Sequence, residues 1–231
     1  MFDVFTKEDI DTLKHDWLTD NCIAFWEEYL EREELSQYPN CNIVLLRPSM
    51  AFMLMQTPDP LTLKEALPDF SKTTHVFLPI NDCRNVEEAE GGSHWSLLLV
   101  SIIDGVSFHY DSLSPSNFDE ARFVSDQIGK LVGRRLKFVD LEDAPQQENS
   151  SDCGIFVCTF MRELLLKKLL RINSKEKINM SMANKVINAS RERKDMLKII
   201  DNFRREGERR RSRSSSPFNK QEQSKSPPRI E

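Results

Sequence analysis

Residues 145–160 read PQQENSSDCGIFVCTF, and the rest of the chain is best interpreted from this stretch. Its polar half ends in four residues that can cap a helix, Asn149 to Asp152, and a largely apolar run follows from Gly154 to Leu170. We therefore expect a buried helix that begins at Cys153. The unpaired N–H groups and the dipole at a helix N-terminus stabilise a thiolate, which is the nucleophilic form of cysteine. Cys153 is therefore a candidate nucleophile.

A structural role is the usual one for a cysteine in an apolar run. Cys158 lies five positions further on without a polar neighbour, and we expect it in the core. Gln147 lies six residues before Cys153, and its amide could donate a hydrogen bond to an oxyanion that forms at a carbonyl under attack. Loop glutamines are usually only solvated, so the signal lies in the combination QQxNxxDCG.

Residues 146–154, QQENSSDCG, resemble the active-site segment of the Ulp/sentrin-specific cysteine proteases, which cut ubiquitin-like modifiers from their conjugates. That family pairs its cysteine with a histidine followed by tryptophan and with an aspartate that follows an aromatic residue. Residues 91–98, GGSHWSLL, and 108–112, FHYDS, are similar to those two segments. The resemblance covers residues 16–170. It implies that His94, Asp111 and Cys153 are catalytic and that Gln147 helps to hold the oxyanion.

Residues 78–82, LPIND, which lead to two glycines at 91 and 92, resemble the deneddylase branch of the family more than the SUMO-cleaving branch. The resemblance implies cleavage after the C-terminal Gly-Gly of a Nedd-type modifier. The modifier would be released from lysine conjugates, such as those of cullins, or from its own precursor. The implied enzyme is a monomer that requires no cofactor, metal, membrane or DNA.

Residues 17–20, WLTD, are similar to the family's WLND, with Thr19 in place of asparagine. The resemblance implies that Trp17 and Trp95 cover the modifier's diglycine, because only residues without side chains pass between two close indoles. Core packing is the default for either tryptophan alone. Asp20 either caps the next helix or pairs with an arginine of the modifier, and the sequence favours capping.

The pattern of the chain predicts an α+β fold with a central mixed sheet flanked by helices, and the resemblance implies that it is papain-like or adenoviral-proteinase-like. Apolar spacing and cap residues predict helices over residues 7–33, 48–55, 118–132 and 153–170. A further helical region extends from after residue 173 toward residue 203. Alternating or continuous apolar runs predict strands over residues 42–46, 75–80, 95–103, 106–110 and 136–139.

The two strands before Asp111 pose a geometric problem. If Asp104 and Gly105 form the hairpin turn, Asp111 faces Leu98, and His94 lies four residues further, about 13 Å away at strand rise. Sheet twist, a bulge or a wider loop must then bring the imidazole to the carboxylate. His109 is the competing histidine, but the glycine-bounded start of a strand favours His94.

Bulk composition indicates one globular domain and a tail. The chain has 231 residues, of which 39% are hydrophobic, enough for a core over residues 1–206. Residues 207–231 are rich in Arg and Ser and are expected to be disordered. The apolar run 97–103 is too short to span a bilayer, and the N-terminus lacks a signal-peptide pattern. Five scattered cysteines favour reduced thiols in the cytoplasm or nucleus, without structural zinc.

The formal charge of −5 is unevenly distributed. Residues 208–231 carry seven Arg or Lys and three Glu, or +4, which leaves −9 on residues 1–207. An acidic body suits a partner with a basic tail, and a merely solvated acidic surface is the equally weighted alternative. The run RERKD at 191–195 is expected to mark a solvated helix face. The basic tail is compatible with import factors, phosphorylation or weak attraction to nucleic acid.

Three alternatives stay open. A SUMO-directed protease would share every catalytic residue. An acyltransferase could use the same thioester chemistry, although the two tryptophans favour a peptide tunnel. A noncatalytic module that binds ubiquitin-like modifiers would keep the tryptophans and discard part of the catalytic set.

Overall fold

The central sheet contains five strands within the described residues, in the order β1-β2-β3-β4-β5. The computed structural model describes residues 6–85, 91–170 and 178–214, with side chains described to residue 209. The strands are β1 (Ile43–Leu45), β2 (His75–Asn81), β3 (Trp95–Ser101), β4 (Val106–Tyr110) and β5 (Lys137–Asp140). The pairs β1–β2 and β4–β5 are parallel, and β2–β3 and β3–β4 are antiparallel. The sheet is therefore mixed, as the sequence predicts.

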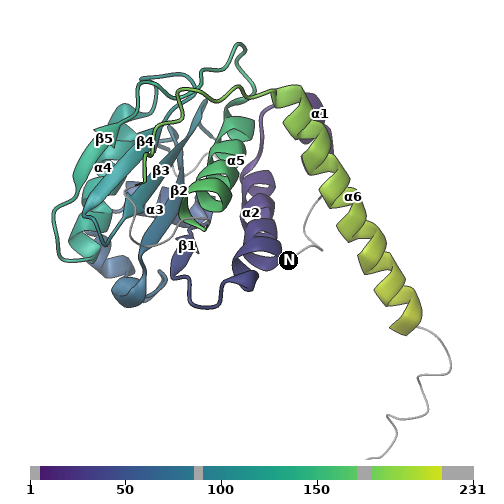
Figure 1. Ribbon diagram of the computed structural model, residues 1–231, viewed down its shortest axis with the longest axis horizontal. Helices are drawn as coiled ribbons and strands as arrows, with labels where there is room; N and C mark the ends of the chain where they lie inside the picture. Colours follow the sequence, from purple (N-terminus) through teal and green to yellow (C-terminus); the bar gives the residue numbers. More distant parts are fainter. Residues whose placement is uncertain (1–5, 86–90, 171–177, 215–231) are drawn as a thin grey trace, which may run out of the picture.

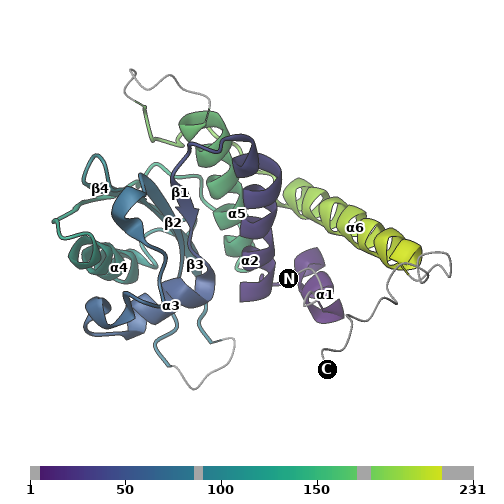
Figure 2. The same ribbon diagram turned by 90° about the horizontal axis from the view of Figure 1, so that it is seen from below.

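Helices cover both faces of the sheet, with α2 and α5 on one face and α3 and α4 on the other (Figures 1 and 2). All of β3 is buried, and its side chains alternate between the two cores. Leu97 and Leu99 pack with α2 and α5, whereas Leu98 and Val100 pack with α3 and α4. Burial on both faces explains why this strand is apolar without interruption. The helices are α1 (Lys7–His15), α2 (Asp20–Tyr29), α3 (Pro48–Gln56), α4 (Phe118–Leu131), α5 (Cys153–Glu163) and α6 (Ala189–Ser214), with short 3-10 or π turns at Leu30–Glu34, Leu35–Gln37, Pro60–Leu63, Phe70–Lys72 and Leu164–Leu169.

The hairpin between β3 and β4 differs from the prediction by two residues of register. Leu97 pairs with Tyr110 and Ser101 pairs with Val106, so the turn contains four residues, 102–105, instead of two. Continuing this register places Asp111 opposite position 96, only two residues from His94 and about 7 Å along the strand. The predicted strand end at residue 103 and the 13 Å separation are therefore wrong. The turn is wider than assumed, which was one of the three possibilities that the sequence left open, and this brings His94 and Asp111 most of the way together.

The predicted helix over residues 7–33 is interrupted at residues 16–19. α1 ends at His15, and Thr19 caps α2 because its hydroxyl accepts a hydrogen bond from the Cys22 N–H at 3.3 Å. Asp20 is the first helical residue, so the prediction that Asp20 caps this helix is wrong. The connection 16–19 is thereby held at the start of α2, next to α5.

The last helix is longer than expected. α6 continues to Ser214, so the helix crosses the domain boundary placed at residue 206, and the disorder expected from residue 207 does not apply to residues 207–214. Its N-terminal part packs on the body through Met196, Ile200 and Phe203, and its C-terminal end extends away from the body (Figure 1). The rest of the predicted tail, 215–231, lies outside the described residues. In the parts of the chain that the structure describes, no helix is long and apolar enough to cross a membrane.

Candidate active site

Cys153 is the first residue of α5, as the sequence predicts. The turn before it is shaped by Asn149, whose side-chain oxygen accepts hydrogen bonds from the N–H groups of Ser151 and Asp152, both at 3.0 Å. The cap residues thus organise the loop, while the Asp152 side chain makes no capping bond to α5. The first N–H groups of a helix have no partner inside the helix, so the sulfur lies at a site that favours negative charge.

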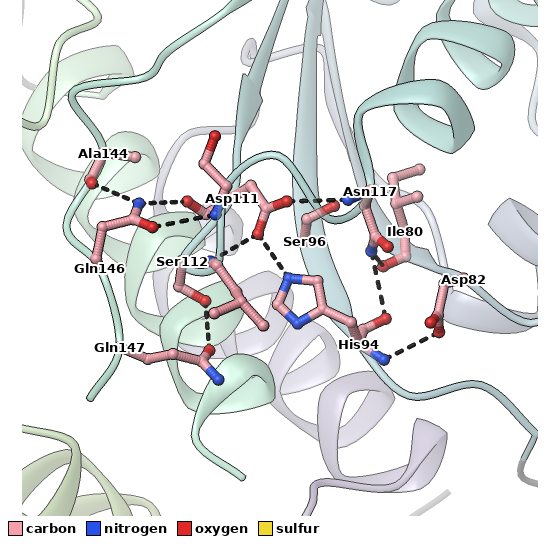
Figure 3. Close-up of polar contacts among 12 residues, drawn as sticks. Ile80, Asp82, His94, Ser96, Asp111, Ser112, Asn117, Ala144, Gln146 and Gln147 are labelled. Atoms are coloured by element: carbon pink, nitrogen blue, oxygen red, sulfur yellow. Dashed lines mark hydrogen bonds and ion pairs between the residues drawn. The ribbon is translucent and has the colours of Figure 1, made fainter. Parts of the chain in front are cut away.

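His94 and Asp111 lie next to one another at the ends of the hairpin. His94 directly precedes β3, Asp111 directly follows β4, and the imidazole Nε2 is 2.6 Å from the carboxylate Oδ1 (Figure 3). The carboxylate also accepts the N–H groups of Leu113 at 2.8 Å and Asn117 at 3.0 Å. Burial acts to raise the pKa of Asp111, but the hydrogen bonds from His94 and these N–H groups outweigh it and lower the pKa. Asp111 is therefore held as a carboxylate.

The surroundings of His94 also change the pKa of its imidazole. Burial acts to lower the pKa of His94, but hydrogen bonds to Asp111 and Cys153, together with attraction to both groups, raise it from 6.5 to about 9. Because Nε2 faces the carboxylate, Nδ1 is the ring nitrogen that is left for the sulfur. The structure thus brings together the three side chains of the predicted catalytic set, which are almost completely buried.

Two residues that sequence reasoning did not select hold the backbone of His94. Asp82 accepts the N–H of His94 at 2.9 Å, and the Asn117 amide donates to the carbonyl oxygens of Ile80 at 3.1 Å and His94 at 3.3 Å (Figure 3). Gly92, with a φ of 94°, lies against Asp82, where a Cβ would come within 2.8 Å of the carboxylate. The segment LPIND contained Asp82, but nothing in its pattern indicated this role.

The two glutamines before Cys153 connect its loop to the segment after Asp111. Gln147 accepts a hydrogen bond from the Ser112 hydroxyl at 2.7 Å, and its amide donates to the Asn149 carbonyl at 2.6 Å. Gln146 donates to the Asp111 carbonyl at 2.8 Å (Figure 3). Gln147, the predicted oxyanion donor, therefore lies beside the site, and its N–H₂ group is hydrogen-bonded to the backbone oxygen of Asn149. The linking role of Gln146 was not predicted.

The predicted substrate-binding residues lie on two neighbouring segments. Trp95 is buried, and its indole N–H donates to the Leu18 carbonyl at 3.2 Å, which joins β3 to the connection 16–19. Trp17, on that connection, is 39% exposed. Asp20 is exposed at the start of α2. The two tryptophans therefore belong to adjoining segments, and their enclosure of a diglycine stays a prediction.

The competing residues have structural surroundings. His109 is buried, with Nδ1 at 2.7 Å from Asp140 and Nε2 at 2.9 Å from the Ser96 hydroxyl, so both ring nitrogens are occupied. Cys158 is buried in the core, and burial raises the pKa of its thiol well above the ordinary value. Over residues 6–85, 91–170 and 178–214 no group of three or more His, Cys, Asp or Glu side chains is placed to hold a metal ion.

A thiol at the start of a buried helix, beside an imidazole and a carboxylate on the adjoining sheet, defines the papain-like class of cysteine peptidases. Comparison with protein families gives a more specific assignment. Residues 16–198 match the Ulp1 protease family, C-terminal catalytic domain. The chain belongs to this family.

Relatives of known name agree with this assignment. The chain is 36% identical over 199 residues to NEDD8-specific protease 2 of Schizosaccharomyces pombe, which covers 84% of this chain and 47% of that protein. It is 33% identical over 189 residues to Sentrin-specific protease 8 of Mus musculus, covering 78% of this chain and 82% of that protein. The chain thus spans less than half the length of the fission-yeast relative.

Solved structures agree on the fold. The C-terminal Ulp1 protease domain, solved in complex with Smt3, the yeast ortholog of SUMO, has a TM-score of 0.57 at 22% identity, covering 84% of this chain and 80% of that chain. This likeness confirms the predicted papain-like fold class.

Proposed function

We propose that the chain is a cysteine protease that removes a Nedd-type ubiquitin-like modifier from lysine conjugates by cleaving after the modifier's C-terminal Gly-Gly. The observation that carries the proposal is the buried pair of His94 and Asp111, 2.6 Å apart, beside Cys153 at the start of α5. Nucleophile, base and orienting group are the minimum set for thiol-dependent acyl transfer.

In the proposed reaction His94 accepts the proton of the Cys153 thiol, and the sulfur attacks the carbonyl carbon of the terminal glycine. The tetrahedral intermediate collapses when the imidazolium returns its proton to the lysine amine, which leaves as the C–N bond breaks. Water, deprotonated by His94, then attacks the thioester, and the modifier departs with a free carboxylate. Asp111 keeps the imidazole in one tautomer and orientation throughout and stays ionised.

The oxyanion is assigned to Gln147 and to backbone N–H groups at the start of α5. Gln147 is anchored by its carbonyl oxygen on Ser112, so its N–H₂ group can exchange the Asn149 carbonyl for the oxyanion without moving the rest of the side chain. This exchange would make the interaction stronger in the transition state than in the resting enzyme.

A narrow substrate suits the site. Cys153 is fully buried and His94 is only 4% exposed, so a chain that reaches them has to be thin. Diglycine lacks side chains and meets this requirement. We assign the cover of this segment to Trp17 and Trp95, and we assign Asp20, exposed beside them, to an arginine of the modifier.

The choice of a Nedd-type modifier is supported by two relatives in fission yeast that are named NEDD8-specific proteases, and the mouse relative is named Sentrin-specific protease 8. Cullin conjugates and modifier precursors are the proposed substrates, in cytoplasm or nucleus, for a protease domain that acts as a monomer. A SUMO-specific protease is the second candidate, since the solved Ulp1–Smt3 complex shares the fold.

The test compares Cys153→Ala with Cys158→Ala on a Nedd-type modifier joined to lysine. Cys153→Ala should abolish cleavage and retain modifier binding, whereas Cys158→Ala, which removes a core thiol in the same helix, should cleave normally. Residual cleavage by Cys153→Ala would refute the assignment. If the chain is a noncatalytic binding module, the wild type and both variants should bind the modifier and none of the three should cleave the conjugate.

A further inference from the structure

Arg193 of α6 is a buried arginine in a run of charged residues. Its guanidinium side chain is only 7% exposed, while the side chain of Arg191 on the same helix is 78% exposed. A buried charge is costly unless it is paired and its N–H groups are satisfied. The expectation that residues 191–195 form a solvated face is therefore wrong for Arg193.

One set of contacts reaches the loop before the nucleophile. Nε and Nη2 of Arg193 donate to Oδ1 of Asp152 at 2.9 and 2.7 Å, and Nη2 also donates to the Ser151 carbonyl at 3.1 Å. Asp152 directly precedes Cys153, and its other oxygen accepts the Asn149 amide at 2.8 Å. The guanidinium thus holds the residue from which α5 begins.

The other set reaches the end of α1. Nη1 donates to the carbonyls of Thr12 at 3.3 Å and Leu13 at 3.0 Å, and Nη2 donates to the carbonyl of Asp16 at 2.8 Å. The carbonyls in the last turn of a helix need outside partners, and a cation there is favoured by the helix dipole. Arg193 therefore fixes the point at which the connection 16–19 leaves α1.

The far side of this connection lies against the active site. Leu18 packs on Gly154, where an added Cβ would come within 2.7 Å of the Leu18 Cβ, and its carbonyl accepts the Trp95 indole N–H. Trp17 is therefore placed by a segment held at one end by Arg193 and at the other by Gly154 and Trp95.

We propose that Arg193 is a positioning residue that locks the Trp17 connection to the loop before Cys153, so that substrate channel and nucleophile form one rigid site. The inference deepens the proposed function and rests on it. Arginine is needed because its planar guanidinium carries N–H donors at three nitrogens and can reach acceptors on two separate segments at once. The single ammonium of lysine can make only some of these hydrogen bonds.

The docking of α6 does not depend on Arg193 alone. Met196 and Ile200 are buried against the body, Phe203 packs edge-on against Phe25, and Glu192 pairs with Arg162 at 2.8 Å. An Arg193→Met variant keeps the aliphatic part of the side chain, so α6 should stay docked while the two segments lose their common partner.

The experiment measures kcat and KM on a modifier–lysine conjugate, the rate at which iodoacetamide alkylates Cys153, and the thermal midpoint. Arg193→Met should lower kcat/KM by about 10- to 100-fold, mostly through KM, because a misplaced channel costs that order of magnitude. Alkylation should stay within about twofold, since the small reagent needs only the thiol and imidazole. Arg193→Lys should recover part of the loss, and Arg191→Met, the exposed control, should match the wild type.

Two results would overturn the inference while leaving the proposed function in place. One is an Arg193→Met variant whose kcat/KM stays within about twofold of the wild type. The other is a parallel loss of cleavage, alkylation and thermal midpoint in both Arg193 variants, which would indicate a general structural role. If the wild-type chain cleaves no modifier conjugate, the proposed function fails and this inference fails with it. That outcome is distinguishable from the two results above, in which the wild type cleaves the conjugate.

Discussion

The charge state of His94 gives the most detailed prediction. Its pKa is raised from 6.5 to about 9, so the imidazolium persists through neutral pH, where it can protonate the leaving amine. Above pH 9 this proton is lost. We therefore expect kcat/KM to hold level up to about pH 9 and then to fall by about tenfold per pH unit.

Asp111→Asn tests the cause of the shift. The carboxylate raises the pKa of His94 through both a hydrogen bond and its charge, so the variant should move the alkaline limb to lower pH. It should also lower kcat by about 10²- to 10⁴-fold, because an amide no longer fixes the tautomer of the imidazole. The matched control is Asp140→Asn, which alters the carboxylate beside the structural His109 and should leave the limb in place.

The assay is initial-rate cleavage of a modifier amide substrate across the pH range at constant ionic strength. Unfolding must be followed in parallel, because the raised pKa of His94 also makes the stability of the protein depend on pH. The stabilisation from protonated His94 is fully present below pH 6.5, the pKa in the unfolded chain, and is lost as the pH rises through about 9. A limb centred near 6.5 in the folded wild type, or one that Asp111→Asn does not move, would refute the reasoning.

Three further predictions concern single side chains. Gly154→Ala should lower the free energy of unfolding by about 1–3 kcal/mol in urea titrations and raise KM, because the new methyl group displaces the Leu18 side chain at its Cβ. An unchanged free energy of unfolding and an unchanged KM would contradict the tight contact. Asp82→Ala should lower kcat/KM by about tenfold or more, since the His94 N–H loses its acceptor. Asp82→Asn should recover part of the rate. Equal kcat/KM values for Asp82→Ala and the wild type would exclude a positioning role. Cys158→Ala should cost about 1–2 kcal/mol of stability by chemical denaturation while kcat stays unchanged.

The local pattern of the sequence was enough to predict the start of α5 and the buried strand β3. Cap residues followed by an apolar run indicate a helix start wherever the chain lies in the fold. The partnership of His94 with Asp111 came from the family resemblance, because the assumed two-residue turn separated them. The turn was placed wrongly because Ile102 and Ile103 are β-branched apolar residues that are typical of a strand. Ile102 packs on the core between the sheet and the helices α3 and α4, whereas Ile103 is 60% exposed in the turn.

Other features depend on tertiary contacts that no local pattern contains. Arg193 stands among four charged neighbours, and only the docking of α6 on α1 and α5 determines which of them is buried. The break at residues 16–19 is similar, because Leu18 leaves the helical path to pack on Gly154 and the start of α5. Asp82 could not be selected either, since its partner N–H lies across a twelve-residue interval.

The most direct measurement offers the protein several ubiquitin-like modifiers that carry a C-terminal electrophile and identifies the captured modifier and the modified residue by mass spectrometry. A Nedd-type modifier should be captured fastest, at Cys153, and Cys153→Ala should capture none. Faster capture of SUMO would contradict the proposed specificity. Attachment at any other cysteine would contradict the assignment of the nucleophile.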